Sequence, residues 1–265
     1  IISLAACIGN TFDFNTLIRV SGKTENELSG LIWELLSNEY INAVGQWGKH
    51  HSDTALSGLL NEEKTNFEFR FQHDKIQQAA YSLIPEDEKP KQHYIIGNLL
   101  LQQMSDIELN EKQFDVLNHF LIGKHFIEST EDREKLAHLC LSDAKKAYRN
   151  NVIRPASTFF GFGMELIKED QSVDIFKDLL IGLSECEYLL GSYDASESLF
   201  NKAVKNASSD LNKADILSRK MALYENTQRN ALANYTAREP HIILGVNLPK
   251  KVNQLHVMKE LMTVK

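Results

Sequence analysis

The tetrapeptide SGKT at residues 21–24 has the residue types that end a phosphate-binding P-loop. The full pattern is G-x-x-x-x-G-K-[ST], in which backbone amides and the lysine hold the phosphates of a nucleotide. The first glycine of this pattern would stand at position 17, where this chain has leucine. A P-loop also follows a buried strand, whereas the preceding "FDFNTLIRV" predicts an amphipathic helix with Phe14, Leu17 and Ile18 on one face. The tetrapeptide is therefore a poor candidate for a nucleotide site.

A helix start explains the same residues better. Thr24 and Glu27 are spaced as a capping box, in which the side chain of each residue bonds to the backbone amide of the other. They open a stretch with helical periodicity, "ENELSGLIWELLSNEY". The sequence therefore predicts a turn and an N-cap between helices at 13–21 and 24–39.

The histidines and cysteines do not form a metal-binding or redox pattern. None of the nine histidines belongs to an H-E-x-x-H motif or to an i, i+4 pair. His119 and His125 are six positions apart, and His50 and His51 stand in an expected loop. The three cysteines are far apart and no C-x-x-C occurs. This spacing argues against a zinc site or a disulfide framework and favours the reducing cytoplasm.

The charge of the chain argues against nucleic acid as a partner. The net charge is −7, and no dense basic run occurs. Residues 1–105 carry 8 basic and 13 acidic side chains, and the helix expected at 24–39 has four glutamates and no lysine or arginine. Such a surface repels the phosphates that dominate nucleic-acid binding.

The apolar runs of the chain are too short for a membrane span, which needs roughly 20 residues. The first residues, "IISLAACIGN", have no methionine and no basic stretch before the apolar part. They do not resemble a signal peptide. We expect no membrane span in this segment, and we expect the chain to be a piece of a longer protein.

The pattern of elements in residues 1–105 predicts a winged helix. Helices are expected at 2–8, 13–21 and 24–39, and strands at 40–47 and 67–72. The second strand, "FEFRFQ", alternates between phenylalanine and polar residues. The polar stretch 48–66 would be the long connection of this two-stranded hairpin. The residues expected in the core from the third helix are Leu31, Trp33, Leu35 and Leu36.

The rest of the chain predicts helices alone. The segment "HDKIQQAAYSLI" carries Ile76, Ala79, Ala80 and Leu83 on one face, and Pro85 should start a helix that runs to about Met104. The prediction is a mainly α chain with two domains, the winged-helix domain and following helices at 1–105 and a helical repeat domain at 106–265.

An internal repeat with an offset of 40 residues indicates antiparallel helix pairs in the second domain. The first copy has Ala144, Ala156, Phe160 and Gly163, and the second has Ser184, Ser196, Phe200 and Ala203. Small residues let two helices approach closely, and the phenylalanine fills the gap to the next pair. The spacing resembles the tetratricopeptide repeat (TPR), usually about 34 residues long. A third copy would place Ala233 and Ala237 at the same positions, with Pro240 ending or kinking its second helix.

Four segments resemble one family of large bacterial signalling proteins. The clearest is "FEFRFQHDKIQQAAYSLIPEDEK" at 67–89, and the others are "LAACIGNTFDFNTL", "ECEYLLGSYDASESLFNKAV" and "LGVNLPKK". Proteins of this family join a serine/threonine-kinase-like domain, a STAND-type AAA ATPase (signal-transduction ATPase with numerous domains) and, usually, a sensor histidine kinase. The resemblance implies that this chain is the winged helix and the beginning of the TPR-like repeats of such a protein.

The resemblance further implies a regulatory segment that is not itself an enzyme. The Walker A lysine and Walker B acid of the family would lie upstream of Ile1, so ADP and ATP belong to the parent protein and no cofactor is expected in this segment. The parent is expected to be an ATP-dependent serine/threonine or histidine kinase. The expected partners are the upstream ATPase domain and a protein or small-molecule effector on the repeats.

The resemblance also makes His73 and Asp74 candidate ADP-binding residues. In STAND ATPases of plant immunity and animal cell death, the winged helix ends in Met-His-Asp, whose histidine reaches the β-phosphate of ADP and locks the closed state. Gln72, His73 and Asp74 stand at the matching positions, so the methionine is missing here. A helix N-terminus attracts anions, which suits this role. The alternative is that His73 and Asp74 only cap the helix that follows.

Two functions therefore remain open for the chain. The first is a regulator that controls the nucleotide state of the ATPase, and the second is a TPR-like scaffold for protein–protein interaction without nucleotide-linked switching. Tyr188, Tyr193 and Tyr224 could line the groove of the repeats or pack between helices.

Overall fold

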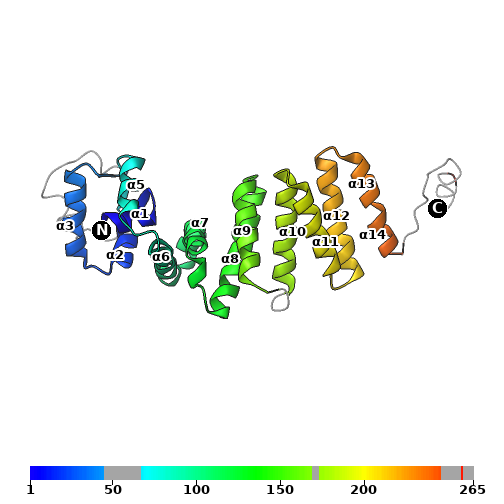
Figure 1. The fold of residues 1–265 in the computed structure, drawn as a ribbon, viewed down its shortest axis with the longest axis horizontal. Helices are drawn as coiled ribbons and strands as arrows, with labels where there is room; N and C mark the ends of the chain where they lie inside the picture. Colours follow the sequence, from blue (N-terminus) through cyan, green and yellow to red (C-terminus); the bar gives the residue numbers. More distant parts are fainter. Residues whose placement is uncertain (45–66, 169–172, 246–257, 259–265) are drawn as a thin grey trace. The chain divides into compact units, whose positions relative to one another are not determined.

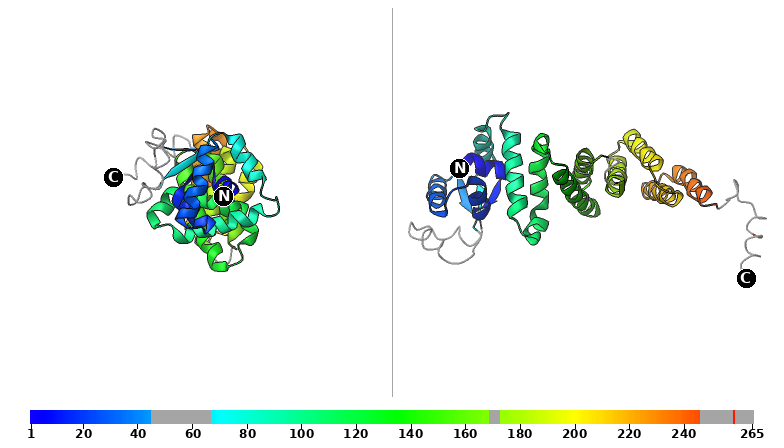
Figure 2. Two further views of the ribbon diagram at one scale, coloured as in Figure 1. Left: turned by 90° about the vertical axis from the view of Figure 1, so that its left-hand side faces the viewer. Right: turned by 90° about the horizontal axis from the view of Figure 1, so that it is seen from below.

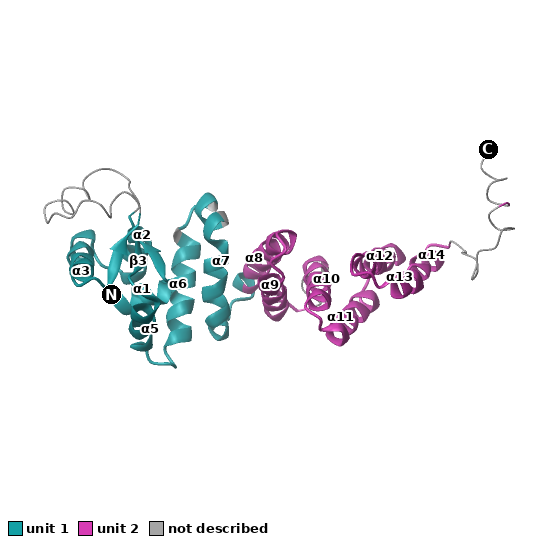
Figure 3. Cartoon of the chain, turned by 90° about the horizontal axis from the view of Figure 1, so that it is seen from above, with its two compact units in different colours: residues 1–132 teal, residues 133–265 magenta. Residues whose placement is uncertain are grey.

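The computed structural model describes residues 1–44, 67–168, 173–245 and 258 (Figure 1). The chain is mainly helical with one small three-stranded sheet, so the predicted mainly α class is confirmed. It divides into two compact units, Ile1–Asp132 and Arg133–Lys265, and each is described on its own (Figure 3). The predicted hairpin connection at 48–66 lies outside the described residues.

The described residues at the start of unit 1 form three helices and three short strands. They are α1 (Ile2–Ile8), β1 (Thr11–Asp13), α2 (Phe14–Ser21), α3 (Glu25–Ser37), β2 (Ile41–Ala43) and β3 (Glu68–Phe71). Antiparallel pairing places β3 between β1 and β2. The three predicted helices are confirmed, and β2 and β3 lie within the strands predicted at 40–47 and 67–72. Residues 45–47 of the first predicted strand lie outside the described residues. Strand β1 was not predicted, because three residues carry too little periodicity to be recognised.

The turn between α2 and α3 has the predicted geometry. Gly22 ends α2 in the left-handed region, with φ of 63°. The Thr24 hydroxyl accepts a hydrogen bond from the Glu27 amide at 3.4 Å, and the Glu27 carboxylate accepts one from the Thr24 amide at 3.0 Å. The capping box is therefore confirmed, and residues 21–24 join two helices instead of following a strand.

Phenylalanine rings lie on the buried face of the sheet. Phe69 and Phe71 of β3 are buried while Glu68 and Arg70 are exposed, as the alternating pattern predicted. The ring of Phe12 on β1 lies 5.9 Å from that of Phe69 and 5.7 Å from that of Phe71, measured between centroids. The sheet therefore contributes one apolar face to the core of unit 1.

Helix α3 buries a slightly different face from the predicted one. Leu28 and Ile32 are fully buried, and Leu35 and Leu36 pack partly against the same cluster. The prediction that Leu31 and Trp33 belong to this core is wrong, since both are half-buried and, unlike Leu35 and Leu36, do not pack against the cluster. They lie on either side of the stripe of positions 28, 32, 35 and 36, whose spacing of three to four residues keeps one helical face inward.

The described part of unit 1 continues with helices α5 to α7 and a 3₁₀ turn. They are α5 (Asp74–Ser82), α6 (Lys89–Gln103), α7 (Asp106–Ile122) and η2 (Lys124–Phe126). Two predictions about this stretch need correction. Ala79 of α5 and Leu83, which follows the helix, are exposed, and Ile84 is buried instead. Helix α6 starts at Lys89, because Pro85 to Glu88 form a turn in which the Pro85 carbonyl accepts from the Glu88 and Lys89 amides.

Helix α7 packs against α6 within unit 1. Gly97 of α6 faces the ring of Phe120, and Gly123 faces the backbone of Tyr94, so the two helices run antiparallel. The sequence had placed the domain division between residues 105 and 106, whereas the compact units divide after Asp132. The physical reason is that α7 buries its apolar face on α6.

The described part of unit 2 holds most of α8 and the helices α9 to α14. They are α8 (Thr130–Arg149), α9 (Ile153–Leu166), α10 (Val173–Leu189), α11 (Tyr193–Lys205), α12 (Asp210–Asn226), α13 (Asn230–Thr236) and α14 (Arg238–Ile243). From α9 to α14, each helix packs against the next along the chain (Figure 2). Helix α8 contacts α9. Arg133 near the start of α8 donates hydrogen bonds to the carbonyls of Glu165 and Leu166 at the end of α9.

Three turns of unit 2 repeat the same backbone geometry. Asn151, Gly191 and Gln228 have positive φ of 61°, 89° and 60°. In each turn the next amide donates to the carbonyl five residues earlier, at 2.9 Å from Val152, 2.9 Å from Ser192 and 2.8 Å from Arg229. This is the Schellman pattern of a helix end. The turns are spaced by 40 and 37 residues, like Ala156, Ser196 and Ala233.

The small residues of the repeat allow close helix contacts, as predicted. The buried members are Ala144, Ala156, Phe160, Gly163, Ser184, Ser196, Phe200 and Ala203. The Ser196 hydroxyl donates to the Ser184 carbonyl at 2.7 Å and so joins α11 to α10. Phe160 of α9 lies on Gly182 of α10, where a Cβ atom would come within 2.4 Å of the ring.

The third copy of the repeat ends as its proline predicted. Ala233 is buried and Ala237 is half-buried. Helix α13 ends at Thr236 and α14 begins at Arg238. Pro240 has no amide proton, and its ring clashes with the carbonyl four residues earlier, at position 236. The helix is therefore interrupted at Ala237.

Replacing Gly182 with alanine should destabilise unit 2. The new methyl group would overlap the Phe160 ring, and overpacking of this kind lowers the free energy of unfolding by about 1–3 kcal/mol. Gly161→Ala is the matched control, because Gly161 is also helical and a Cβ there meets nothing within 4 Å. Replacing a helical glycine with alanine also stabilises the helix by about 1 kcal/mol. Because both variants have this gain, the difference between them reports the overlap with Phe160. Urea unfolding of both variants measures the difference, and equal stabilities would contradict the close contact.

Candidate functional site

His73 and Asp74 lie at the exposed start of α5. His73 is the N-cap residue and Asp74 is the first helical residue. Both side chains are exposed, and the His73 side chain makes no capping hydrogen bond. The alternative that the His73 side chain caps the helix is therefore not supported, while Asp74 suits the positive end of the helix dipole. Contact of His73 with ADP stays a prediction.

A chain of hydrogen bonds runs through the interior of unit 1. The Tyr81 hydroxyl lies 2.9 Å from Nε2 of His93, and Nδ1 of His93 lies 2.8 Å from Nδ1 of His119. His119 also bonds to the backbone of Ile8. These residues come from α5, α6, α7 and α1, so the chain links four helices.

The directions of these hydrogen bonds follow from neutral imidazoles. A neutral histidine has one donor and one acceptor nitrogen. If His119 donates to the Ile8 carbonyl, its Nδ1 must accept from Nδ1 of His93. Nε2 of His93 must then accept from the Tyr81 hydroxyl. Every nitrogen of the two rings has a partner in this arrangement.

Burial keeps both histidines neutral. It lowers the pKa of His93 from 6.5 to about 4, and the charge of Lys89 adds to the effect. It lowers the pKa of His119 from 6.5 to about 3, with a further contribution from His93 and an opposing one from the bond to Ile8. Neither ring therefore exchanges protons near pH 7, and the pair joins helices instead of acting as an acid or base.

No local sequence pattern predicted this pair. His93 and His119 are 26 residues apart, and only the antiparallel packing of α6 on α7 brings them together. His125 is exposed on η2, so His119 and His125 diverge as expected.

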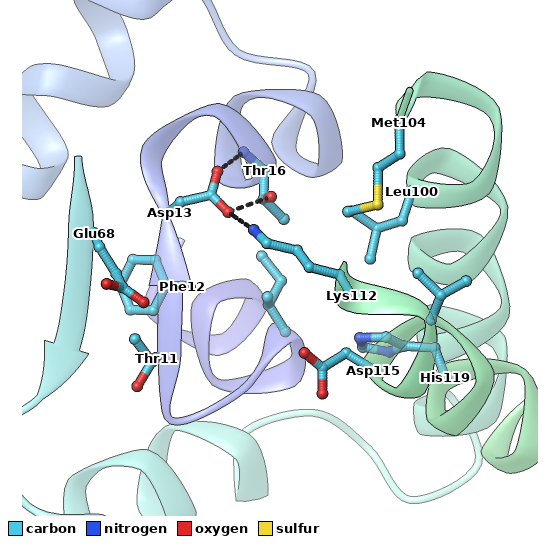
Figure 4. Close-up of a pocket in the computed structure, with 12 residues that line it drawn as sticks. Thr11, Phe12, Asp13, Thr16, Glu68, Leu100, Met104, Lys112, Asp115 and His119 are labelled. Carbon is cyan, nitrogen blue, oxygen red and sulfur yellow. Dashed lines mark hydrogen bonds and ion pairs between the residues drawn. The ribbon is translucent and has the colours of Figure 1, made fainter. Parts of the chain in front are cut away.

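A second polar contact joins α7 to the start of α2 (Figure 4). The buried Asp13 carboxylate is the N-cap of α2 and accepts from the Thr16 amide at 2.7 Å and the Thr16 hydroxyl at 2.8 Å. Lys112 of α7 donates to the same carboxylate at 2.6 Å. Burial alone would raise the pKa of Asp13, but the hydrogen bonds from Lys112 and Thr16 outweigh it and lower the pKa. Asp13 is therefore charged at neutral pH.

The three cysteines are buried and free. Burial raises the pKa of Cys7 to about 11 and that of Cys186 to about 12, and it raises the pKa of Cys140 further. All three thiols are therefore protonated near pH 7 and lack the thiolate that a nucleophile or a metal ligand needs. Within the described ranges, no group of three or more histidine, cysteine or acidic side chains is arranged to hold a metal ion.

The tyrosines of unit 2 pack mostly between helices. Tyr188 and Tyr224 are buried, with ring centroids 5.3 Å apart. Tyr193 is 43% exposed and its ring is covered by the Arg229 guanidinium, 3.9 Å from the centroid. Of the two alternatives for these tyrosines, Tyr188 and Tyr224 therefore pack between helices, whereas Tyr193 reaches the surface.

A row of polar contacts crosses three helices of unit 2. Lys145 of α8 forms an ion pair with Asp178 of α10 at 2.7 Å. Glu185 of α10 accepts from Tyr148 of α8 and lies 3.5 Å from the Arg219 guanidinium of α12. Burial raises the pKa of Glu185, while Arg219 and Tyr148 oppose the shift. These contacts connect α8 with α10 and α10 with α12.

The comparisons with known proteins point to signal transduction. The chain is 22% identical over 268 residues to "Hybrid signal transduction histidine kinase G" of Dictyostelium discoideum, a match that covers 84% of this chain and 8% of that protein. No protein-family model matches the chain, and no solved structure matches it. The match indicates a distant relationship to a signalling protein, and its source gives no support to a bacterial origin. Among the described helices, none has the length and apolar character to cross a membrane.

Unit 1 should lose stability as the pH falls from about 6.5 towards 4. The pKa values of His93 and His119 are about 4 and about 3 in the folded chain, against 6.5 when exposed. The unfolded chain therefore binds protons in this window that the folded chain does not. The contribution of the two histidines to the free energy of unfolding is fully present above pH 6.5. Below that pH, the free energy of unfolding falls by about 1.4 kcal/mol per pH unit for each histidine, until the pKa of the folded chain is reached.

Urea unfolding between pH 7 and pH 4 measures this dependence. The variant His119→Gln should be less stable at pH 7 but should show a shallower decline. His125→Gln is the control, because His125 is exposed in the same unit, and it should follow the parent curve. An unchanged slope in His119→Gln would show that the pair does not carry the effect.

Proposed function

We propose that this chain is a regulatory segment of a larger signal-transduction ATPase–kinase and is not itself catalytic. The observation that carries the proposal is the order α1, β1, α2, α3, β2, β3 with β3 in the centre of the sheet. Three helices followed by two antiparallel strands is the arrangement of a winged helix. The distant match to a signal transduction histidine kinase supports a signalling context.

In this proposal, unit 1 docks on a STAND-type AAA ATPase domain that precedes it in the longer protein. The nucleotide, ADP or ATP, belongs to that domain and not to residues 21–24, which form a helix cap. The docked winged helix stabilises the ADP-bound resting form. The parent protein is a cytoplasmic kinase, as the family resemblance implies.

His73 is the residue proposed to sense ADP. Its side chain is exposed at the start of α5 and is not used in capping, so it is free to donate to a phosphate of a neighbouring domain. The amide groups at the start of α5 and the helix dipole would add attraction for the same anion. Asp74, the first residue of α5, is the other candidate that the family resemblance implies.

Unit 2 is proposed to bind a protein or small-molecule effector through TPR-like repeats. The three equivalent turns and the close contacts of small residues support a repeating array. An effector that prefers the open, ATP-bound state would shift the population of the parent protein towards that state. The same array also supports the second candidate, a protein–protein interaction scaffold without nucleotide-linked switching.

The variant His73→Ala tests the sensor role in the longer protein that contains the ATPase domain. Loss of one hydrogen bond to a charged phosphate weakens binding by about 1.5–3 kcal/mol, so ADP affinity measured by calorimetry should fall about tenfold or more. His125→Ala is the control, since His125 is an exposed histidine of the same unit. Unchanged ADP affinity in His73→Ala would refute the sensor role.

Nucleotide dependence separates the regulator from the scaffold. Effector proteins captured by the longer protein should differ between ADP and a non-hydrolysable ATP analogue if the winged helix controls the state of the repeats. Identical capture in both nucleotides would favour the scaffold.

A further inference from the structure

A cleft in unit 1 lies between strand β1 and the helices α6 and α7 (Figure 4). Its volume is about 160 Å³. An engineered protein cavity of about 150 Å³ holds benzene, so this cleft has room for a molecule of about six heavy atoms. The proposed function assigns no role to this cleft.

The side of the cleft formed by α6 is an apolar wall that includes Leu100 and Met104 (Figure 4). Ile8 and Val116 add further apolar lining. Leu100 and Val116 are buried, while Met104 is half-buried at the end of α6. A short hydrocarbon chain placed against this wall would leave water, which is favourable in proportion to the apolar area removed.

The polar wall carries an excess of negative charge. Asp13 is neutralised by Lys112, but Glu68 and Asp115 also line the cleft and form no ion pair within the described parts of the chain. Asp115 accepts no hydrogen bond there either, and partial burial raises its pKa while the nearby Lys112 lowers it. His119 contributes no positive charge, because its pKa is about 3.

An apolar wall beside unpaired carboxylates suits an amphipathic cation. We propose that the cleft binds a short aliphatic amine, with its methylene groups against Leu100 and Met104 and its ammonium group at Asp115. An ammonium is a donor of hydrogen bonds only, and a carboxylate accepts them. Glu68, on the sheet side of the cleft, reinforces the preference for a cation. A carboxylate ligand would meet the same two acids and be repelled, since Lys112 is already held by Asp13.

Isothermal titration calorimetry of the chain with butane-1,4-diamine tests the proposal. The measurement uses pH 7 and a fixed salt concentration, because exposed charges are screened by salt. Butane-1,4-diol has the same length without charge, and succinate has a similar length with the opposite charge. The diamine should bind, and the diol and succinate should bind at least tenfold more weakly.

The variant Asp115→Asn identifies the carboxylate that binds the amine. It should weaken binding of the diamine at least tenfold, and it should fold normally because Asp115 has no hydrogen bond to lose. Asp87→Asn is the matched control, since Asp87 is exposed in the same unit and does not line the cleft. Equal binding of diamine and diol, binding of succinate in preference to the diamine, or undiminished binding in Asp115→Asn would each overturn the proposal.

Discussion

Unit 1 depends on the position of β3 between two strands. The pairing of β3 with β1 and β2 brings together residues 11–13, 41–43 and 68–71, which the sequence separates by two helices and a long connection. A strand exposes alternate side chains on opposite faces, so Phe69 and Phe71 enter the core with Phe12. The same pairing fixes Asp13 at the end of β1 and fixes His73 just after β3. The positions of Asp13 and of His73 therefore both depend on the register in which β3 pairs with its neighbours.

Polar contacts then join α6 and α7 to the part of unit 1 that contains the sheet, from α1 to α5. The chain from Tyr81 through His93 and His119 to Ile8 and the ion pair of Lys112 with Asp13 both cross that boundary. A buried polar group that loses its partner is costly, so these contacts hold α7 in one orientation on the first helices. A division of the chain after residue 105 would separate Asp13 from Lys112 and would separate His119 from both His93 and Ile8.

Local features of the fold could be predicted from the sequence, because they depend on neighbouring residues. The capping box of Thr24 and Glu27, the alternation in β3 and the break at Pro240 each need fewer than six residues to be recognised. The repeat was visible because equivalent small residues recur at a fixed offset. The contacts of the site were not visible. Lys112 is 99 residues from Asp13, and no local period relates the two positions.

The charge states of unit 1 restrict how a signal could act on it. His93 and His119 are neutral and Cys7 is protonated near pH 7, while Asp13 keeps its charge because Lys112 and Thr16 stabilise it. A change of one pH unit around neutrality therefore alters none of these interior groups. A switch in this unit must act through groups that a ligand can reach, and a ligand shifts a conformational equilibrium only through its different affinity for the two states. His73 at the start of α5 and Asp115 at the cleft are exposed groups of this kind. Recognition is therefore expected at the surface of unit 1, and the interior hydrogen bonds hold its helices together.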